Sequence, residues 1–287
     1  MGFFSKGLLM PRSIADLIQD RFGLPTVAGH SMPAEGTIAQ QLAHRSIRRF
    51  KDKPVGDELI EIALSAALSA PSKSDLQQAS VIDVTDPSLR EEINALVPAM
   101  PWMAQASRFL VFCGDNHRMR RIAEMRGKPY PNDTLDMFMN AAVDAGLTLQ
   151  SFITAAQALG LGCCPVSLIR NQIDELSRLL QLPTEVFPVA GLCVGFPAES
   201  GHISMRLPLS ITVHKNRYDA SAFAINLEAY DTRRSIKEPT ADAKQKYAAQ
   251  WGVIPRYTWS EDKARQYSVP ERHRFGAFVR AQGFALK

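Results

Sequence analysis

The segment LDMFMNAAVDAGLTLQSFITAAQALGL, residues 135–161, decides the fold, because it is the most apolar long segment of the 287-residue chain. Its pattern predicts a helix over about 133–159 that ends at Gly160 and Gly162. A helix this apolar needs cover on most of its circumference, which favours a central buried helix, with a place at a dimer interface as a further possibility. A membrane span is not favoured, because the segment contains charged and amide side chains: Asp136, Asn140, Asp144, Gln150 and Gln157.

Extended apolar segments before and after this helix predict a sheet. RFLVFCGD (108–115) is apolar enough for a strand that is covered on both faces. Helices and strands alternate without an internal repeat, so we expect an α+β protein with a sheet of four or five strands flanked by helices. The other predicted strands are ASVIDVTD (79–86), GCCPVSLI (162–169), VFPVAGLCVGFP (186–197) and LSITVHKNRY (209–218).

Helical patterns fill much of the remaining chain. The helix predicted at 57–70 is apolar on nearly all sides and is therefore expected to be buried. Residues 1–38 combine one short helix with a link punctuated by Gly and Pro, so they are an N-terminal extension to a body at 39–287. The other predicted helices lie at 14–21, 37–46, 87–96 and 171–181, and near 240–250 and 270–283.

The composition argues against several classes of protein. A net charge of +4 is too mild to indicate nucleic-acid binding. The N-terminal sequence MGFFSKGLLMPRS has too short an apolar run for a secretion signal. We therefore expect a cytoplasmic protein that binds neither nucleic acid nor membrane. Four cysteines lie in apolar segments without a CxxC pair and are expected to be reduced and buried: Cys113, Cys163, Cys164 and Cys193.

Common motifs of nucleotide and metal sites do not occur in the sequence. There is no GxGxxG and no GxxxxGK[ST], so Rossmann and P-loop folds have no support. His202 and His214 lack the spacing of metal ligands, and a solvated histidine is the better interpretation of each. No metal site is therefore expected.

The segment HRSIRRF, residues 44–50, concentrates groups that bind anions. Arg45 and Arg48 can make charge-assisted hydrogen bonds to a phosphate or to an electron-rich ring, and His44 and Ser46 add further donors. A solvated basic surface would have the same composition. The spacing alone leaves both interpretations open.

The loop SAPSKSDLQ, residues 69–77, follows a predicted buried helix and could line a pocket with polar groups. An ordinary turn between a helix and a strand would look the same. The groups in question are Ser72, Lys73, Ser74 and Gln77.

Two later segments could contribute to an anion or ring site. In GLGCCPVSLIRN (160–171) a strand leads into the start of a helix, where backbone N–H groups favour an anion or a reducible ring. Arg206 in SMRLPLSITVHKNRY (204–218) precedes a predicted strand. A lone arginine is equally typical of a protein surface.

Taken in order, these segments resemble the nitroreductase family of FMN enzymes, most closely its branch of oxygen-insensitive NADPH nitroreductases and NADPH-flavin oxidoreductases. That branch has HRSxRxF, a Ser-rich loop that ends in glutamine, and a G-G-[LI]-R-N turn, to which SLIRN (167–171) is similar. It also has LP-x-x-V-x-P-x-x-G-L-C-x-G-x-P, matched by LPTEVFPVAGLCVGFP (182–197). Its K-P-R-L-P-x-x-x-x-V-H-x-N-x-Y resembles residues 204–218. The similarity covers roughly residues 40–285.

The resemblance implies a fold and an activity. The fold would be a three-layer α-β-α sandwich with a central mixed sheet, a long buried central helix, and a domain-entwined homodimer in which residues 219–287 wrap the partner. Two FMN sites would lie at the dimer interface. The activity would be ping-pong hydride transfer through flavin N5, from NAD(P)H to nitroaromatics, quinones or flavins.

The resemblance also implies roles for the singled-out residues, none of them an acid or base. Arg48 would lie near the N1/O2 edge of the flavin, where a cation raises the reduction potential, and Arg206 would bind the phosphate. The partner chain would supply Ser72, Lys73, Ser74 and Gln77. The remaining flavin contacts would come from His44, Arg45, Ser46 and Ser204, and from the turn Pro165, Val166, Ser167 and Leu168.

Three departures from the family pattern keep other functions open. Ser167-Leu168 stands where the branch has Gly-Gly, and Ser204-Met205 stands where it has Lys-Pro. Gln250 and Pro255 stand where basic residues would grip NADPH, so NADH and NADPH both remain possible donors. The alternatives are a flavin-binding or regulatory protein without turnover, and a flavin-linked dehydrogenase or dehalogenase.

Overall fold

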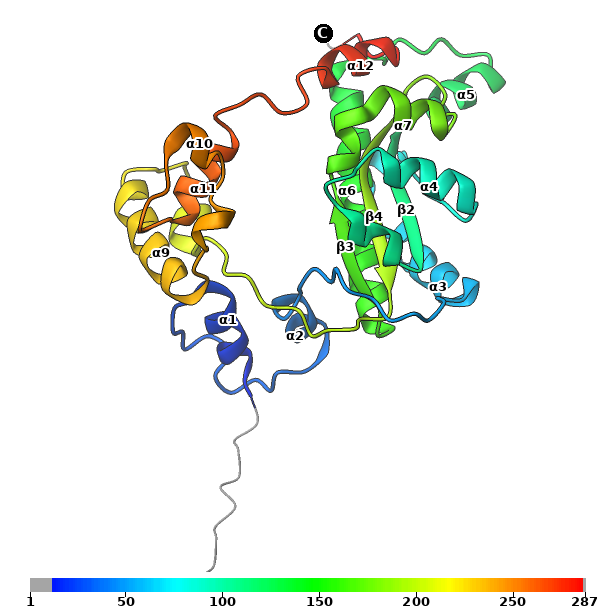
Figure 1. The fold of residues 1–287 in the computed structure, drawn as a ribbon. Helices are drawn as coiled ribbons and strands as arrows, with labels where there is room; N and C mark the ends of the chain where they lie inside the picture. Colours follow the sequence, from blue (N-terminus) through cyan, green and yellow to red (C-terminus); the bar gives the residue numbers. More distant parts are fainter. Residues whose placement is uncertain (1–11, 286–287) are drawn as a thin grey trace, which may run out of the picture. The chain divides into compact units, whose positions relative to one another are not determined.

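The computed structural model describes residues 12–285 and divides into two compact units (Figure 1). One unit contains residues 12–45 and 202–270, and the other contains residues 46–201 and 271–285.

The second unit is built on a four-stranded sheet with the order β1-β2-β4-β3. Its strands are β1 (Ala79–Asp83), β2 (Arg108–Asp115), β3 (Gly162–Val166) and β4 (Val186–Gly195). Every neighbouring pair is antiparallel, so the mixed sheet that we expected is wrong for the described residues. The reason is topological: β2 and β3 run in the same direction, but β4 lies between them and pairs with both.

One face of the sheet is covered by the predicted central helix, α6 (Leu135–Ala158), and by α3 (Asp57–Leu68). Thr134 caps α6 by accepting a hydrogen bond from the Met137 N–H, and Gly160 ends the turn that follows with a φ of 77°. Apolar side chains of β2 alternate between the faces, and those that meet α6 include Leu110 and Phe112.

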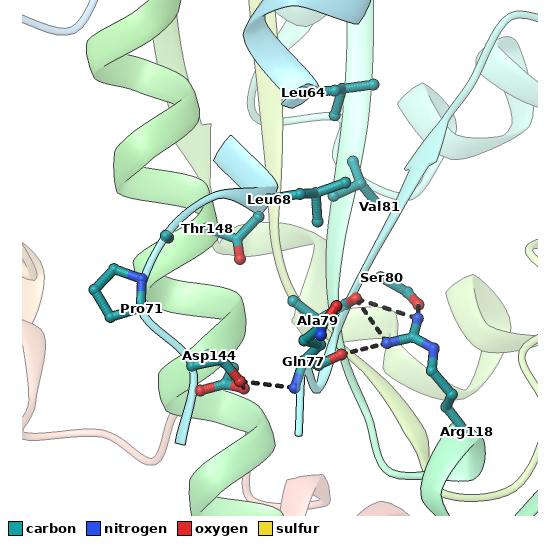
Figure 2. A pocket seen from close by; sticks show the side chains of 12 residues that line it. Leu64, Leu68, Pro71, Gln77, Ala79, Ser80, Val81, Arg118, Asp144 and Thr148 are labelled. Atoms are coloured by element: carbon teal, nitrogen blue, oxygen red, sulfur yellow. Dashed lines mark hydrogen bonds between the residues drawn. The ribbon is translucent and has the colours of Figure 1, made fainter. Parts of the chain in front are cut away.

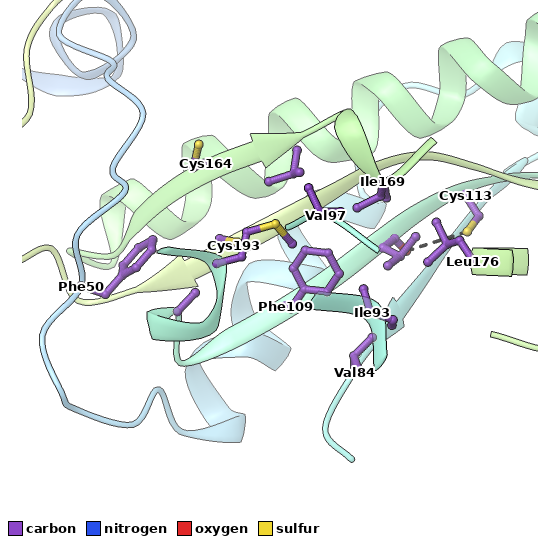
Figure 3. Close-up of a cluster of buried hydrophobic side chains, with 14 of the residues drawn as sticks. Phe50, Val84, Ile93, Val97, Phe109, Cys113, Cys164, Ile169, Leu176 and Cys193 are labelled. Atoms are coloured by element: carbon purple, nitrogen blue, oxygen red, sulfur yellow. Dashed lines mark hydrogen bonds between the residues drawn. The ribbon is translucent and has the colours of Figure 1, made fainter. Parts of the chain in front are cut away.

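The opposite face is covered by α4 (Pro87–Ala95) and α7 (Ile173–Leu179) with the short helices η2 (Pro101–Gln105) and η3 (Leu168–Gln172). Figure 3 shows the cluster there, in which Phe109 and Cys113 of β2 pack among Ile93 of α4, Ile169 of η3 and Leu176 of α7. The three-layer α-β-α arrangement is therefore confirmed.

The C-terminal segment of the described chain packs on this same unit. Phe278 and Phe284 lie with Phe138 of α6 and Phe187 of β4 in an aromatic cluster, which anchors α12 (Phe275–Ala281). The cluster places residues 271–285 beside the end of α6 from which the helix begins.

The other unit is mainly helical in its described residues. The strand predicted at 209–218 is wrong, because the chain forms the short helix α8 (Leu209–Thr212) and then an irregular segment. Residues 209–218 alternate between apolar and polar side chains, but a strand also needs a neighbour to pair with. Within residues 12–285, no strand of this unit pairs with this segment. The other helices are α1 (Ile14–Phe22), α2 (Gly36–Leu42), α9 (Phe223–Lys237), α10 (Ala248–Trp251), α11 (Trp259–Gln266) and η4 (Asp242–Lys244).

Helix α3 of the second unit exposes apolar side chains. The prediction that the helix after Asp57 is buried on nearly all sides is wrong, because Ile62 and Leu68 of α3 are exposed. Among the described residues, no helix is long and apolar enough to cross a bilayer.

Candidate functional site

The second half of HRSIRRF is anchored to the sheet by its backbone and by two buried side chains. The Ile47 N–H donates to the Cys163 carbonyl at 2.9 Å, and Phe50 forms a bridge with Pro197. A Cβ on Gly162 would lie 2.8 Å from Ile47 Cγ1, and one on Gly195 would lie 2.7 Å from Phe50 Cδ1. Glycine at these two positions lets the segment lie directly against β3 and β4.

Anchoring Ile47 places Ser46 and Arg48 next to the buried Cys164 of β3. Burial raises the pKa of the Cys164 thiol, while Arg48 and a hydrogen bond from Ser46 oppose the rise. Arg48 is otherwise exposed, with its guanidinium 6.0 Å from the ring centroid of Trp102. An exposed arginine above a buried strand can meet an aromatic or anionic ligand without a large desolvation cost.

The predicted turn 165–168 continues directly from β3. Pro165 and Ser167 are exposed, whereas Val166 is buried and Leu168 packs partly on the core. Ser167 has a φ of −82°, and Leu168 is not among the described residues with positive φ. The turn thus forms without a conformation that needs glycine, although the family pattern has glycines there.

The loop of residues 72–77 is held in an unusual conformation by a buried carboxylate. Ser74, Asp75 and Gln77 have φ values of 50°, 58° and 51°, which are costly for residues with a Cβ. Asp144 of α6 is 3% exposed. It accepts hydrogen bonds from the Ser72 hydroxyl at 2.7 Å, the Lys73 N–H at 3.2 Å and the Gln78 N–H at 3.0 Å.

A pocket of about 360 Å³ opens beside this loop (Figure 2). Arg118 of α5 (His117–Met125) lies on one side of it and donates to the Gln77 carbonyl and to the Ser80 hydroxyl. Asp144 and Thr148 of α6 lie on the other side. The apolar part of its lining includes Leu64, Leu68, Ala70, Pro71, Ala79 and Val81.

The phosphate-binding candidates Arg45 and Arg206 both belong to the unit of residues 12–45 and 202–270. Arg206 is exposed and donates to the Ser204 hydroxyl at 3.0 Å. Arg45 is half-buried and has no ion pair or hydrogen-bond partner within residues 12–285. The His44 carbonyl accepts a hydrogen bond from the Arg21 guanidinium.

The structure therefore brings the predicted site residues together in three groups. His44, Arg45, Ser204 and Arg206 belong to one unit. In the other unit, Ser46 and Arg48 lie with the 165–168 turn at β3, while Ser72, Lys73, Ser74 and Gln77 lead into β1. Since β1 and β3 are the two edge strands, the last two groups lie at opposite edges of the sheet.

Sequence reasoning missed two residues that organise these groups. Asp144 could have been found from the sequence, because a carboxylate in a buried helix needs hydrogen-bond donors. We used this residue only to argue against a membrane span. Arg21 carried none, because one arginine near the end of a short polar helix is typical of a surface.

The chain is similar to known proteins of one family. Residues 42–196 match the nitroreductase family, and residues 204–287 match the C-terminal domain of that family. An oxygen-insensitive NADPH nitroreductase of Salmonella typhimurium is 34% identical over 88% of this chain and 99% of its own. An FMN reductase (NADPH) of Bacillus subtilis is 31% identical over 86% of this chain and 98% of its own. The solved structure of the NfrA1 nitroreductase from B. subtilis has a TM-score of 0.78 and 31% identity, covering 87% of this chain and 99% of that one.

Proposed function

Because the chain belongs to the nitroreductase family, we propose that it is an FMN-dependent NAD(P)H oxidoreductase that reduces nitroaromatics, quinones or flavins. The observation that carries this proposal is the similarity to an NADPH nitroreductase and an FMN reductase over nearly their full lengths. Family resemblance narrows the reaction class, and the acceptor within that class is a matter for assay.

The residues present fit FMN, although no cofactor is part of the structure. A flavin mononucleotide combines a dianionic phosphate with a planar ring. Arg45 has no anionic partner within residues 12–285, and Arg206 is exposed, so both have donors for a phosphate. Ser46 and Arg48 offer adaptable donors for a ring, and the 165–168 turn adds backbone groups.

Bound FMN would supply the redox chemistry, and the protein would supply binding, orientation and electrostatics. Arg48 adds a positive charge that favours negative charge on the reduced ring. Ser167 and Leu168 offer backbone groups at the end of a strand instead of a side-chain acid or base. We therefore propose no side-chain acid or base for this site.

We also propose that the enzyme is a homodimer with each FMN site shared by two chains. Two parts of the predicted flavin contact lie at opposite edges of the sheet, three strand spacings or about 14 Å apart. A single chain would have to span this distance to bring Arg48 at β3 and Gln77 at β1 to the same ring. Two chains can do so if each provides one edge, which is the arrangement that the family resemblance implies.

The surface of α6 supports the same proposal. Leu135, Met139, Val143 and Leu147 follow each other at intervals of four residues, and they are 48%, 54%, 52% and 40% exposed. Such spacing makes a continuous apolar stripe along one side of the helix. If each half-exposed side chain contributes roughly 1 kcal/mol on burial, the stripe favours association by about 4 kcal/mol per chain.

Three further expectations remain proposals about the whole protein. We place the family domain at residues 39–287 after an N-terminal extension of 1–38, and we expect residues 219–287 to wrap the partner. The four cysteines are free and buried, which supports a reducing location such as the cytoplasm.

The proposal is tested by NAD(P)H oxidation with an added quinone and FMN, in the unmodified protein and in the double variant Arg45→Ala, Arg206→Ala. Removing two charge-assisted phosphate contacts should weaken FMN binding about 100-fold or more. Arg49→Ala is the matched control, because Arg49 belongs to the same motif but is not a proposed FMN contact. Its side chain is exposed, and its Nη1 lies 3.9 Å from Oε2 of Glu199.

Each outcome of this assay has a definite meaning. Turnover that is lost at low FMN in the double variant, and kept in the control, supports both the function and the phosphate contacts. FMN binding without turnover in the unmodified protein would favour a flavin-binding protein instead. Turnover with a different acceptor class would favour a flavin-linked dehydrogenase or dehalogenase.

A further inference from the structure

Arg21, in the N-terminal helix α1, joins the two backbone segments that carry the phosphate-binding candidates. Its guanidinium donates to the Leu42 carbonyl from Nε at 3.0 Å and from Nη2 at 2.8 Å. It also donates to the His44 carbonyl, and to the Ser204 carbonyl from Nη1 at 2.9 Å. In return, the Arg21 carbonyl accepts a hydrogen bond from the Arg206 N–H at 2.8 Å. One residue thus fixes the chain just before Arg45 and at Arg206.

The charge of Arg21 is not neutralised by a carboxylate. The side chain is only 5% exposed, and it forms no ion pair among the described residues. Burial is the largest cause that lowers the pKa of Arg21, and repulsion from Arg206 and Arg45 lowers it further. Attraction to Glu238 raises the pKa and so opposes these effects. Glu238 is itself paired with Arg234 at 3.1 Å. The cluster of Arg21, Arg45 and Arg206 therefore has a surplus of positive charge that an anion would offset.

Helix α1 and its C-cap residue contact Ser204 and Met205, which depart from the family pattern. Gly23, at its C-terminal end, has a φ of 68°, and a Cβ there would lie 2.6 Å from Met205 Cε. Ser204 and Met205 occupy the positions where the family pattern has lysine and proline. The family match begins only at residue 42, so α1 lies outside it. Ser204 therefore contacts α1 and Met205 contacts its C-cap residue, and α1 and this C-cap both lie outside the family match.

We infer that α1 completes the phosphate end of the flavin site, with Arg21 as a positioning residue that holds Arg45 and Arg206 and supplies the positive charge that Ser204 lacks. The ligand group is the dianionic phosphate monoester of FMN. This inference rests on the proposed function and adds to it a role for the N-terminal extension. Arg21 does not touch the ligand in this account, because all its assigned hydrogen bonds go to backbone carbonyls.

The test compares FMN with riboflavin, which has the same ring and no phosphate. Full-length protein freed of flavin is titrated with each, and flavin fluorescence gives the two dissociation constants. Arg21→Met should lower the preference for FMN over riboflavin about tenfold or more. Arg12→Met is the control, because Arg12 carries the same charge in the same extension but is exposed and paired with Asp20 at 2.6 Å.

Two further variants separate this role from a general effect on folding. Arg21→Met combined with Ser204→Lys should recover most of the lost preference, because the lysine returns a cation to this segment. Arg21→Lys keeps the charge but cannot donate to three carbonyls in the same geometry, so it should lower the preference about threefold. If Arg21→Met does not fold, as judged by circular dichroism, Arg21→Lys decides.

An unchanged preference for FMN in Arg21→Met, or in Arg21→Lys where that variant decides, would overturn the inference. Equal weakening of FMN and riboflavin would also overturn it, because that result describes a structural role only. Absence of FMN binding by the unmodified protein would be a different failure, since it would remove the proposed function itself.

Discussion

The buried carboxylate of Asp144 offers the sharpest test of how the fold positions the site. In Asp144→Asn the amide oxygen can still accept from the Ser72 hydroxyl and the Gln78 N–H, which share one carboxylate oxygen. The amide NH₂ then faces the Lys73 N–H, which loses its acceptor. One charge-assisted bond disappears and two are weakened, so the free energy holding the loop should fall by about 2–4 kcal/mol.

The assay is tryptic cleavage at Lys73, which lies exposed in the loop that Asp144 holds. A loss of 2–4 kcal/mol raises the open population of the loop roughly 30- to 1000-fold, and cleavage should accelerate in proportion while opening is fast. Urea unfolding at fixed protein concentration gives the matching change in global stability. Asp136→Asn is the control, because Asp136 lies on the same helix but is exposed and, within residues 12–285, accepts a side-chain hydrogen bond only from Asn140.

Equal cleavage rates in Asp144→Asn and in the unmodified protein would refute this reasoning. That result would mean that the positive φ values of the loop are held by other contacts. Faster cleavage in Asp136→Asn as well would point to a general loosening of α6 instead of a specific anchor.

Other predictions concern the exposed arginine, the apolar stripe and the buried thiols. Arg48→Ala should lower the flavin reduction potential more than it weakens FMN binding, and a potentiometric titration without a shift would remove that role. Val143→Glu should shift the protein from dimer to monomer in sedimentation, whereas a dimer of unchanged affinity would exclude the α6 stripe as the interface. Burial raises the pKa of Cys113 and Cys193 to about 12, so their protonated state stabilises the fold at neutral pH. The free energy of unfolding should fall as pH rises from the ordinary thiol pKa of 9.0 towards 12, with a smaller slope in Cys193→Ala.

Elements with strong local signals could be predicted from the sequence. β2 was recognisable because RFLVFCGD is apolar from Phe109 to Gly114, which is what a strand covered on both faces requires. α6 was recognisable from its long apolar pattern and the glycines that follow it. In both cases the local sequence pattern and the buried position in the fold require the same thing, which is apolar side chains.

Features that depend on distant parts of the chain could not be predicted. The segment at 209–218 alternates like a strand but lacks a paired neighbour in the described chain, and the 15-residue helix α9 is too polar to stand out. The antiparallel sheet depends on β4 lying between β2 and β3, which no local pattern encodes. The contact of Arg21 with Ser204 joins residues 183 positions apart.

The visible spectrum of the purified protein, recorded before and after anaerobic addition of NADPH, shows whether the protein binds FMN and accepts a hydride from NADPH. We expect a flavin spectrum that bleaches when the donor is added, with NADH tried as the second donor. A colourless protein that takes up no FMN would contradict the account. A flavin spectrum that persists with both donors would contradict the proposed oxidoreductase activity and leave only flavin binding.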